Sequence, residues 1–227
     1  MSHHESQAPG ADGRMVDRML FFSDAVFAIV LTIMVLELQA PILHDDPLKT
    51  MASAAALWQA LGESELPRTL FAYLVSFAIV GLWWSVHMRV TRSLHRFDWP
   101  TAVCNLVFLL TVTLVPFAAA VLGQHIANPA SWVLYWGINA AASFALTVMM
   151  FVVSRNAGVL LGGMTGLDRL GRLIQSVGPG IAFAVGAVLA GTDHLDLSRF
   201  CWLLIPPMML LARLLHRKPA TEKAPAA

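Results

Sequence analysis

Long uncharged, apolar segments recur along the chain, and they limit its possible folds more than any other feature. A helix needs about 20 mostly apolar residues to cross the hydrocarbon core of a bilayer. Six segments meet this requirement, at about residues 19–39, 67–88, 99–122, 131–154, 173–191 and 198–215. The chain is 57% hydrophobic and only 13% charged, whereas soluble domains average about 25% charged residues. These proportions exclude a water-soluble core and predict an all-α, polytopic membrane protein with six transmembrane helices.

Prolines and glycines mark the ends and interruptions of these segments. Pro67 and Pro100 stand in the first turns of the second and third spans, where proline is well tolerated. Asn128-Pro129 separates the third span from the fourth. The fifth span contains Gly178-Pro179-Gly180 and the sixth contains Pro206-Pro207. We therefore expect the last two spans to be kinked or broken at these positions.

The segments outside the six spans are short and polar. The N-terminal segment lacks the short apolar run and cleavage site of a signal peptide, so we expect the first span to be retained. We assign residues 1–17 and 217–227 to flexible cytoplasmic termini, and residues 18–216 to one six-helix membrane domain. Residues 42–66 include no run long enough to cross a membrane, and their Ala-rich part predicts a short helix against the outer surface.

The basic residues are distributed unequally between the two sides of the predicted membrane domain. Of the 15 Lys and Arg residues, all but Lys49, Arg68 and Arg199 fall in the two termini, the 2–3 loop or the 4–5 loop. Loops rich in Lys and Arg stay in the cytoplasm. We therefore expect both termini in the cytoplasm, which agrees with an even number of spans.

Other classes of protein have little support. Cys104 and Cys201 lie in apolar segments and are too few for a disulfide framework or a zinc site. No metal or cofactor site is predicted, and a formal net charge of +1 gives no indication of a nucleic-acid partner. His125 and His194 stand alone near the outer surface, without an H-E-x-x-H or G-x-S-x-G motif. We therefore predict that the protein is not an enzyme.

The first span, RMLFFSDAVFAIVLTIMVLELQAP, has two different faces. At about 100° per residue, Ile29, Ile33 and Leu36 fall within about 60° of one another, with Thr32 at their flank. Asp24 falls on nearly the opposite side. Such an aliphatic stripe is typical of a lipid-facing or packing surface.

Asp24 and Ser23 are polar residues near the start of this apolar helix. A carboxylate buried in hydrocarbon costs several kcal/mol unless it is paired or hydrated, although the cost falls close to the headgroups. We therefore interpret Asp24 as an architectural lock, held inside the protein. Arg18 lies nearby, and the second span places Trp84 and His87 at a similar depth. We expect an Asp24–His87 contact that a tryptophan N–H completes; His87 as an ordinary interfacial histidine is the alternative.

A set of motifs then resembles a known family. The first span carries R-x-x-x-F-S-D at residues 18–24, and further matches follow in order at Trp84-x-x-His87, Asp98, Asn105 and Pro116-Phe117. These motifs are similar to those of the transmembrane-protein-175 family of potassium channels, in its single-repeat prokaryotic form. The resemblance covers roughly residues 14–122. Beyond them it depends on the number of spans and the charges of the loops.

This resemblance implies a homotetramer in the inner (plasma) membrane, in which the first helix of each subunit lines a central pore. Potassium would be the permeant ion, with no other cofactor. The implied constriction consists of Ile29, Ile33 and Leu36, with Thr32 as a hydroxyl ring that orders ions. The implied network that locks the pore helix consists of Arg18, Phe22, Ser23, Asp24, Trp84 and His87.

The chain has no TVGYG-like run that could form a carbonyl filter. A ring of aliphatic side chains can instead close a pore by dewetting. Glu37, near the outer end of the first span, would either raise the local cation concentration or lie at the membrane interface. The alternative function is a proton-coupled secondary transporter that uses Asp24 and His87 as a relay.

Overall fold

The structure, a computed structural model, describes residues 11–38, 54–91, 94, 98–156 and 166–215, and these residues form helices and short connections. Four long elements are α1 (Ala11–Ile33), α4 (Leu66–Thr91), α7 (Pro129–Asn156) and α8 (Gly166–Gly191). The shorter ones are η1 (Met34–Glu37), α3 (Ala54–Glu63), α5 (Trp99–Thr113), α6 (Val115–Gln124), α9 (Leu195–Ser198), η2 (Cys201–Leu204) and α10 (Ile205–Leu215). The predicted all-α class is confirmed for this part of the chain.

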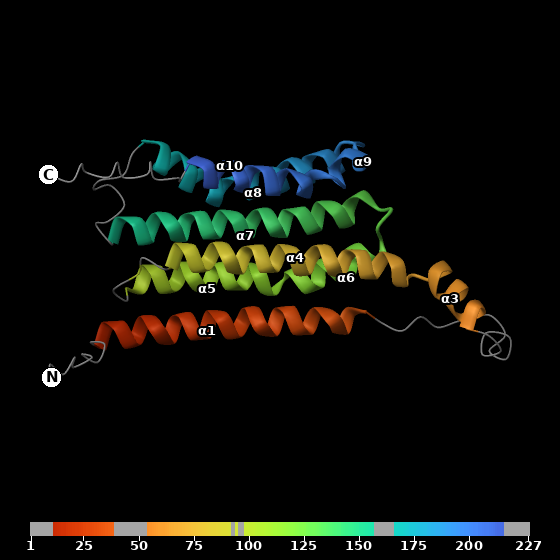
Figure 1. Ribbon diagram of the computed structural model, residues 1–227, viewed down its shortest axis with the longest axis horizontal. Helices are drawn as coiled ribbons and strands as arrows, with labels where there is room; N and C mark the ends of the chain where they lie inside the picture. Colours follow the sequence, from red (N-terminus) through yellow and green to blue (C-terminus); the bar gives the residue numbers. More distant parts are fainter. Residues whose placement is uncertain (1–10, 39–53, 92–93, 95–97, 157–165, 216–227) are drawn as a thin grey trace, which may run out of the picture.

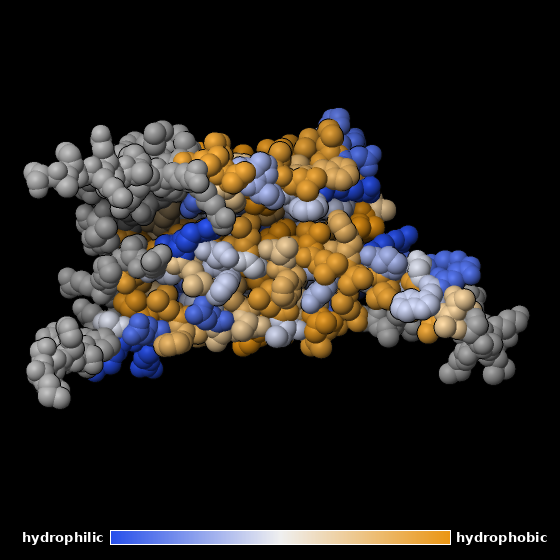
Figure 2. Space-filling view, viewed as in Figure 1, coloured by the Kyte–Doolittle hydropathy of each residue, from blue (hydrophilic) through white to orange (hydrophobic). Residues whose placement is uncertain are grey.

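The long helices of the chain lie side by side along one direction and form a bundle, with α1 on one side of it (Figure 1). α1 contacts α4, α5 and α6, while α7 packs against α5 and α8. The start of α1 and the end of α10 lie at the same end of the bundle (Figure 1). Figure 2 shows hydrophobic residues over most of the middle of the visible face, with hydrophilic residues gathered toward the two ends. This distribution is that of a membrane-embedded helix bundle.

Aromatic side chains and buried hydrogen bonds join the central helices. The fully buried Trp83 of α4 and Trp136 of α7 both pack against Phe183 of α8, with ring centroids 5.7 and 5.4 Å apart. Trp83 donates its indole N–H to Oδ1 of Asn139 at 3.1 Å, across the α4–α7 contact. Trp136 donates to Oγ of Ser198 at 3.0 Å, which ties α7 to α9. Each buried indole thus has the polar partner that burial demands.

Four stretches of the described residues are long and apolar enough to cross a membrane: Gly13–Glu37, Leu66–Thr91, Trp99–Gln124 and Pro129–Val153. They correspond to the first four predicted spans. The apolar helices Val177–Gly191 and Cys201–Leu211 are shorter and correspond to the fifth and sixth. Four of the six predicted spans are therefore supported by length and composition.

The third predicted span is interrupted within the membrane domain. α5 ends at Thr113 and α6 begins at Val115, with Leu114 between them. Leu114 donates its backbone N–H to the carbonyl of Thr111 at 3.3 Å, as in a 3₁₀ turn. Pro116 explains the interruption, because its ring has no N–H and clashes with the carbonyl four residues earlier.

The two predicted proline breaks have different outcomes. The sequence predicts a kink or a break of the fifth span at Pro179; α8 continues through this residue, so it is not broken there. The sixth segment is divided into η2 and α10, and Pro206 and Pro207 fall in the first turn of α10. A first-turn proline loses no intrahelical hydrogen bond because its N–H would have no partner. The predicted break in the sixth span is thus confirmed.

The structure also tests where the first span begins and what the segment after it forms. α1 begins at Ala11, so residues 11–17, which we assigned to a flexible terminus, are helical. Val16 is buried there and continues the packed face of the helix. The predicted short helix after the first span is present as α3, which has no buried residue and projects beyond the bundle (Figure 1). Residues 1–10, 39–53 and 216–227 lie outside the described part of the chain.

Candidate functional site

One face of α1 packs against the rest of the chain. Its buried residues Val16, Ser23, Phe27 and Val30 follow helical spacing, and the buried Met34 of η1 continues them. The remaining surface of the helix is largely uncovered. Only 28% of an 18-residue apolar segment within Gly13–Glu37 is buried, compared with 50% of such a segment within Trp99–Gln124. α1 is therefore a peripheral helix of the single chain, with much of its apolar surface available to lipid or to another subunit.

The predicted aliphatic stripe lies on this uncovered surface. Ile29, Ile33 and Leu36 are 55%, 43% and 73% exposed. Thr32 is exposed beside them and donates its hydroxyl to the backbone carbonyls of Ala28 and Ile29, at 3.0 and 2.9 Å. Because these bonds use the hydroxyl hydrogen, the exposed Thr32 oxygen can still accept a hydrogen bond or contact a cation. The stripe thus combines a smooth apolar surface with one oxygen acceptor.

The first predicted span ends in the 3₁₀ turn η1 rather than in a continuation of α1. In a 3₁₀ turn, side chains at positions i and i+3 lie directly above one another. Leu36 therefore stays in line with Ile33, and Glu37 follows the buried Met34 onto the packed face. The predicted stripe places Leu36 by the geometry of an α-helix. Leu36 keeps its place in the stripe although it lies in a 3₁₀ turn.

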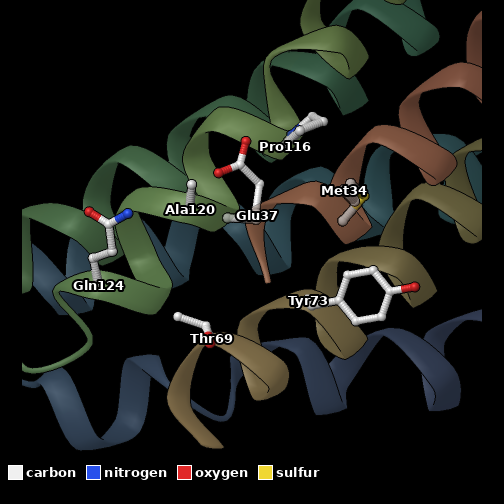
Figure 3. Close-up of a pocket in the computed structure, with 8 residues that line it drawn as sticks. Met34, Glu37, Thr69, Tyr73, Pro116, Ala120 and Gln124 are labelled. Atoms are coloured by element: carbon white, nitrogen blue, oxygen red, sulfur yellow. The ribbon is translucent and has the colours of Figure 1, made fainter. Parts of the chain in front are cut away.

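Glu37 consequently turns toward its own chain. It is half-buried and, together with Thr69 and Tyr73 of α4 and Gln124 of α6, lines a small pocket. Figure 3 shows its carboxylate directed toward α6, near Pro116. In this conformation Glu37 does not share the face of the aliphatic stripe, which weighs against the predicted role at the outer pore.

A buried polar cluster fixes the packed face of α1. Asn105 of α5 donates its amide N–H to Oγ of Ser23 at 2.9 Å, and Ser23 donates to the carbonyl of Met19 at 2.9 Å. His87 of α4 lies 2.8 Å from Oδ1 of Asn105 through its Nε2. An amide oxygen only accepts hydrogen bonds, so Nε2 of His87 carries the proton. Ser23, His87 and Asn105 are at most 1% exposed.

Aromatic rings enclose the histidine of this cluster. His87 stacks on Phe108 of α5, with ring centroids 5.5 Å apart and planes 9° apart. Phe27 of α1 packs against the same imidazole at 5.7 Å. His87 is therefore a buried structural residue at the junction of α1, α4 and α5, and the interpretation of an ordinary interfacial histidine is wrong.

Asp24 has a different partner from the one predicted. Trp84 of α4 donates its indole N–H to Oδ1 of Asp24 at 3.0 Å, and both residues are exposed. The predicted tryptophan contact is thus present, but His87 bonds to Asn105 instead of Asp24. Asp24 lies at the edge of the packed face, about 100° around the helix from Ser23. That position explains why it does not reach the protein interior.

The other two motif residues point away from the core. Arg18 is exposed, and Phe22 is 52% exposed. Of the R-x-x-x-F-S-D motif, therefore, only Ser23 is buried within the chain. The predicted site did not include Asn105, which bonds to both Ser23 and His87. A single amide in an apolar span is a signal for a buried polar contact and could have identified it.

Within the described residues, no group of three or more His, Cys, Asp or Glu side chains is arranged to hold a metal ion. Cys104 and Cys201 are both free thiols. The hydrogen bonds described above serve helix packing, so the candidate site is a surface of α1 with a supporting network behind it.

Comparison with known proteins gives these features a family context. A family model described as endosomal/lysosomal potassium channel TMEM175 matches residues 18–116. A potassium channel of Streptomyces collinus is 35% identical over 109 residues, 48% of each chain. A potassium channel of Chryseobacterium sp. is 34% identical over 144 residues, 62% of this chain and 66% of that protein. The matches thus span about half to two thirds of these relatives' own length.

A solved structure extends the likeness to the second half of the chain. The crystal structure of a lysosomal potassium-selective channel TMEM175 homologue from Chamaesiphon minutus superposes with a TM-score of 0.61. The superposition covers 89% of this chain and 96% of that one, at 24% identity. Residues 18–116 are thus similar in sequence to the TMEM175 family, and the chain shares the fold of that solved structure over 89% of its length.

Proposed function

We propose that the protein is a potassium-permeable cation channel, formed by four identical chains around a central pore that α1 lines. The observation that carries this proposal is the aliphatic stripe of α1. Ile29, Ile33 and Leu36 face away from the chain, while Ser23 on another face joins a buried polar network. One chain has a single α1 and cannot enclose a symmetric path alone, so closure requires several copies.

The proposed membrane arrangement has six crossings, with α8 as the fifth and η2 with α10 as the sixth. Both termini would lie in the cytoplasm of the inner membrane, because nearly all Lys and Arg residues flank that side. The start of α1 and the end of α10 lie at the same end of the helix bundle, which supports an even number of crossings (Figure 1).

The proposed constriction acts both as gate and as selectivity element. A narrow ring of Ile and Leu side chains excludes water, so ions meet a barrier without a bulky plug. In a wider state, partly dehydrated cations would pass, and Thr32 would offer oxygen atoms to them. K⁺ holds its water less tightly than Na⁺ and would therefore cross more easily.

The alternative transporter function receives less support from the geometry. A relay through Asp24 and His87 needs the two groups to exchange a proton, but their hydrogen bonds go to Trp84 and Asn105. Asn105 accepts from the imidazole and donates to Ser23, and an amide is a poor proton carrier. Uptake of a solute that is driven by a pH gradient alone would favour the transporter.

The testing experiment measures K⁺, Na⁺ and H⁺ flux in proteoliposomes that contain purified protein. Ile29→Asn places a polar group in the proposed constriction and is expected to raise leak or abolish the preference for K⁺. Ile181→Asn on α8 is the matched control, because both isoleucines are 55% exposed. Equal flux for wild type and Ile29→Asn, or equal effects of the two substitutions, would contradict the proposed constriction.

A further inference from the structure

A groove lies on a different side of the bundle from the aliphatic stripe. It runs between α4 and the η2–α10 segment and encloses about 500 Å³. Its walls are mostly apolar, with Val75, Ile79 and Leu82 on one side and Ile205 and Met209 on the other. A volume of this size is in the range of small-molecule binding sites, and far larger than the space for a single water molecule.

The groove runs along α4. Its lining on α4 extends from Val75 to Arg89, which at 1.5 Å per residue is about 21 Å along the helix. The hydrocarbon core of a bilayer is about 30 Å thick. Measured from one membrane surface, the groove therefore extends through one leaflet and past the middle of the bilayer. This length is enough for one acyl chain of a lipid.

The polar residues of the groove lie at that surface. Ser85 and the exposed Arg89 line its end, four residues apart and so on the same side of α4. In the orientation proposed above, this is the cytoplasmic end. A guanidinium there complements an anionic phosphate, for which arginine supplies paired donors. Basic groups beside grooves between transmembrane helices favour anionic lipids over neutral ones.

We propose that this groove binds one anionic phospholipid of the cytoplasmic leaflet per chain. An acyl chain would lie along the exposed lining residues Ala78 and Leu210, and the headgroup phosphate would contact Arg89 and Ser85. The proposal uses the membrane orientation of the proposed function but not the pore. A failure of lipid binding would thus leave ion conduction untouched, and a failure of conduction would leave lipid binding untouched.

The test is native mass spectrometry of the purified full-length protein, incubated with equal amounts of phosphatidylglycerol and phosphatidylcholine. We expect the wild type to retain phosphatidylglycerol preferentially. Arg89→Gln should reduce this preference about fivefold, the factor for one basic residue near an anionic surface. Arg68→Gln is the matched charge control, because Arg68 lies near the opposite end of α4 in an exposed ion pair with Glu65.

A second variant tests the apolar part of the groove. Ala78 is exposed and lines it, so Ala78→Trp should fill the space and reduce binding of both lipids without a change of charge. An unchanged lipid preference in Arg89→Gln, or unchanged lipid binding in Ala78→Trp, would overturn the proposal. Dissociation of the oligomer by Ala78→Trp without loss of lipid would also overturn it, since a second copy would then occupy the groove.

Discussion

Asn105→Ala offers the most direct test of the network behind α1. The side chain is 1% exposed and makes two interhelical hydrogen bonds, to Ser23 at 2.9 Å and to His87 at 2.8 Å. In membrane proteins such bonds contribute on average about 0.6 kcal/mol and at most about 1.7 kcal/mol each. Ser23 keeps its bond to Met19 in the variant, whereas the Nε2–H of His87 loses its acceptor. We therefore expect the free energy of unfolding to fall by about 1 to 3 kcal/mol.

The assay is unfolding of the purified protein by titration with a denaturing detergent. Leu106→Ala is the control, because Leu106 is the next residue of α5 and is 51% exposed. In a double-mutant cycle, Ser23→Ala and Asn105→Ala should couple by about 0.5 kcal/mol or more, as expected for residues in contact. If Asn105→Ala costs no more than Leu106→Ala, or the cycle is additive, the network does not hold α1.

Two further predictions concern close packing and the exposed end of the motif. A Cβ at Gly180 would lie 2.5 Å from Oγ of Ser143, whereas one at Gly137 would meet nothing within 4 Å. Gly180→Ala should therefore lower stability by about 1 to 3 kcal/mol and Gly137→Ala should not, in the same detergent titration; equal effects would refute the tight α7–α8 contact. Trp84→Phe removes the donor to the exposed Asp24 and should cost under about 1 kcal/mol in thermal unfolding assays. A loss above about 2 kcal/mol would show a larger role for this bond than its exposure indicates.

The sequence predicted the angles between side chains on α1 but not the direction in which the helix packs. Ile29 and Asp24 do lie on different sides of the helix, yet both are exposed, because a third face that includes Ser23 and Phe27 packs on the chain. α1 has apolar residues on every side, so hydrophobicity does not identify the buried one. The isolated polar residues do, since Ser23, His87 and Asn105 meet in the core.

The helical segments followed from length and hydropathy, but their local breaks depended on tertiary packing. Pro116 interrupts the third span and Pro206 lies where the sixth changes from η2 to α10, whereas Pro179 is accommodated within α8. The 3₁₀ turn at Met34–Glu37 was not foreseen either. It carries no proline or glycine, and its effect on Glu37 could be recognised only in the structure.

The central claim is that the aliphatic stripe of α1 borders an ion path that water enters when the constriction is wide. It is tested most directly with Thr32→Cys, in a background where Cys104 and Cys201 are replaced by serine. A charged thiol reagent reacts only where water reaches the thiol. The account predicts that modification of Thr32→Cys stops K⁺ flux, while the likewise exposed control Ile181→Cys on α8 keeps its flux. Unchanged flux in Thr32→Cys despite full modification, or equal loss in both variants, would contradict it.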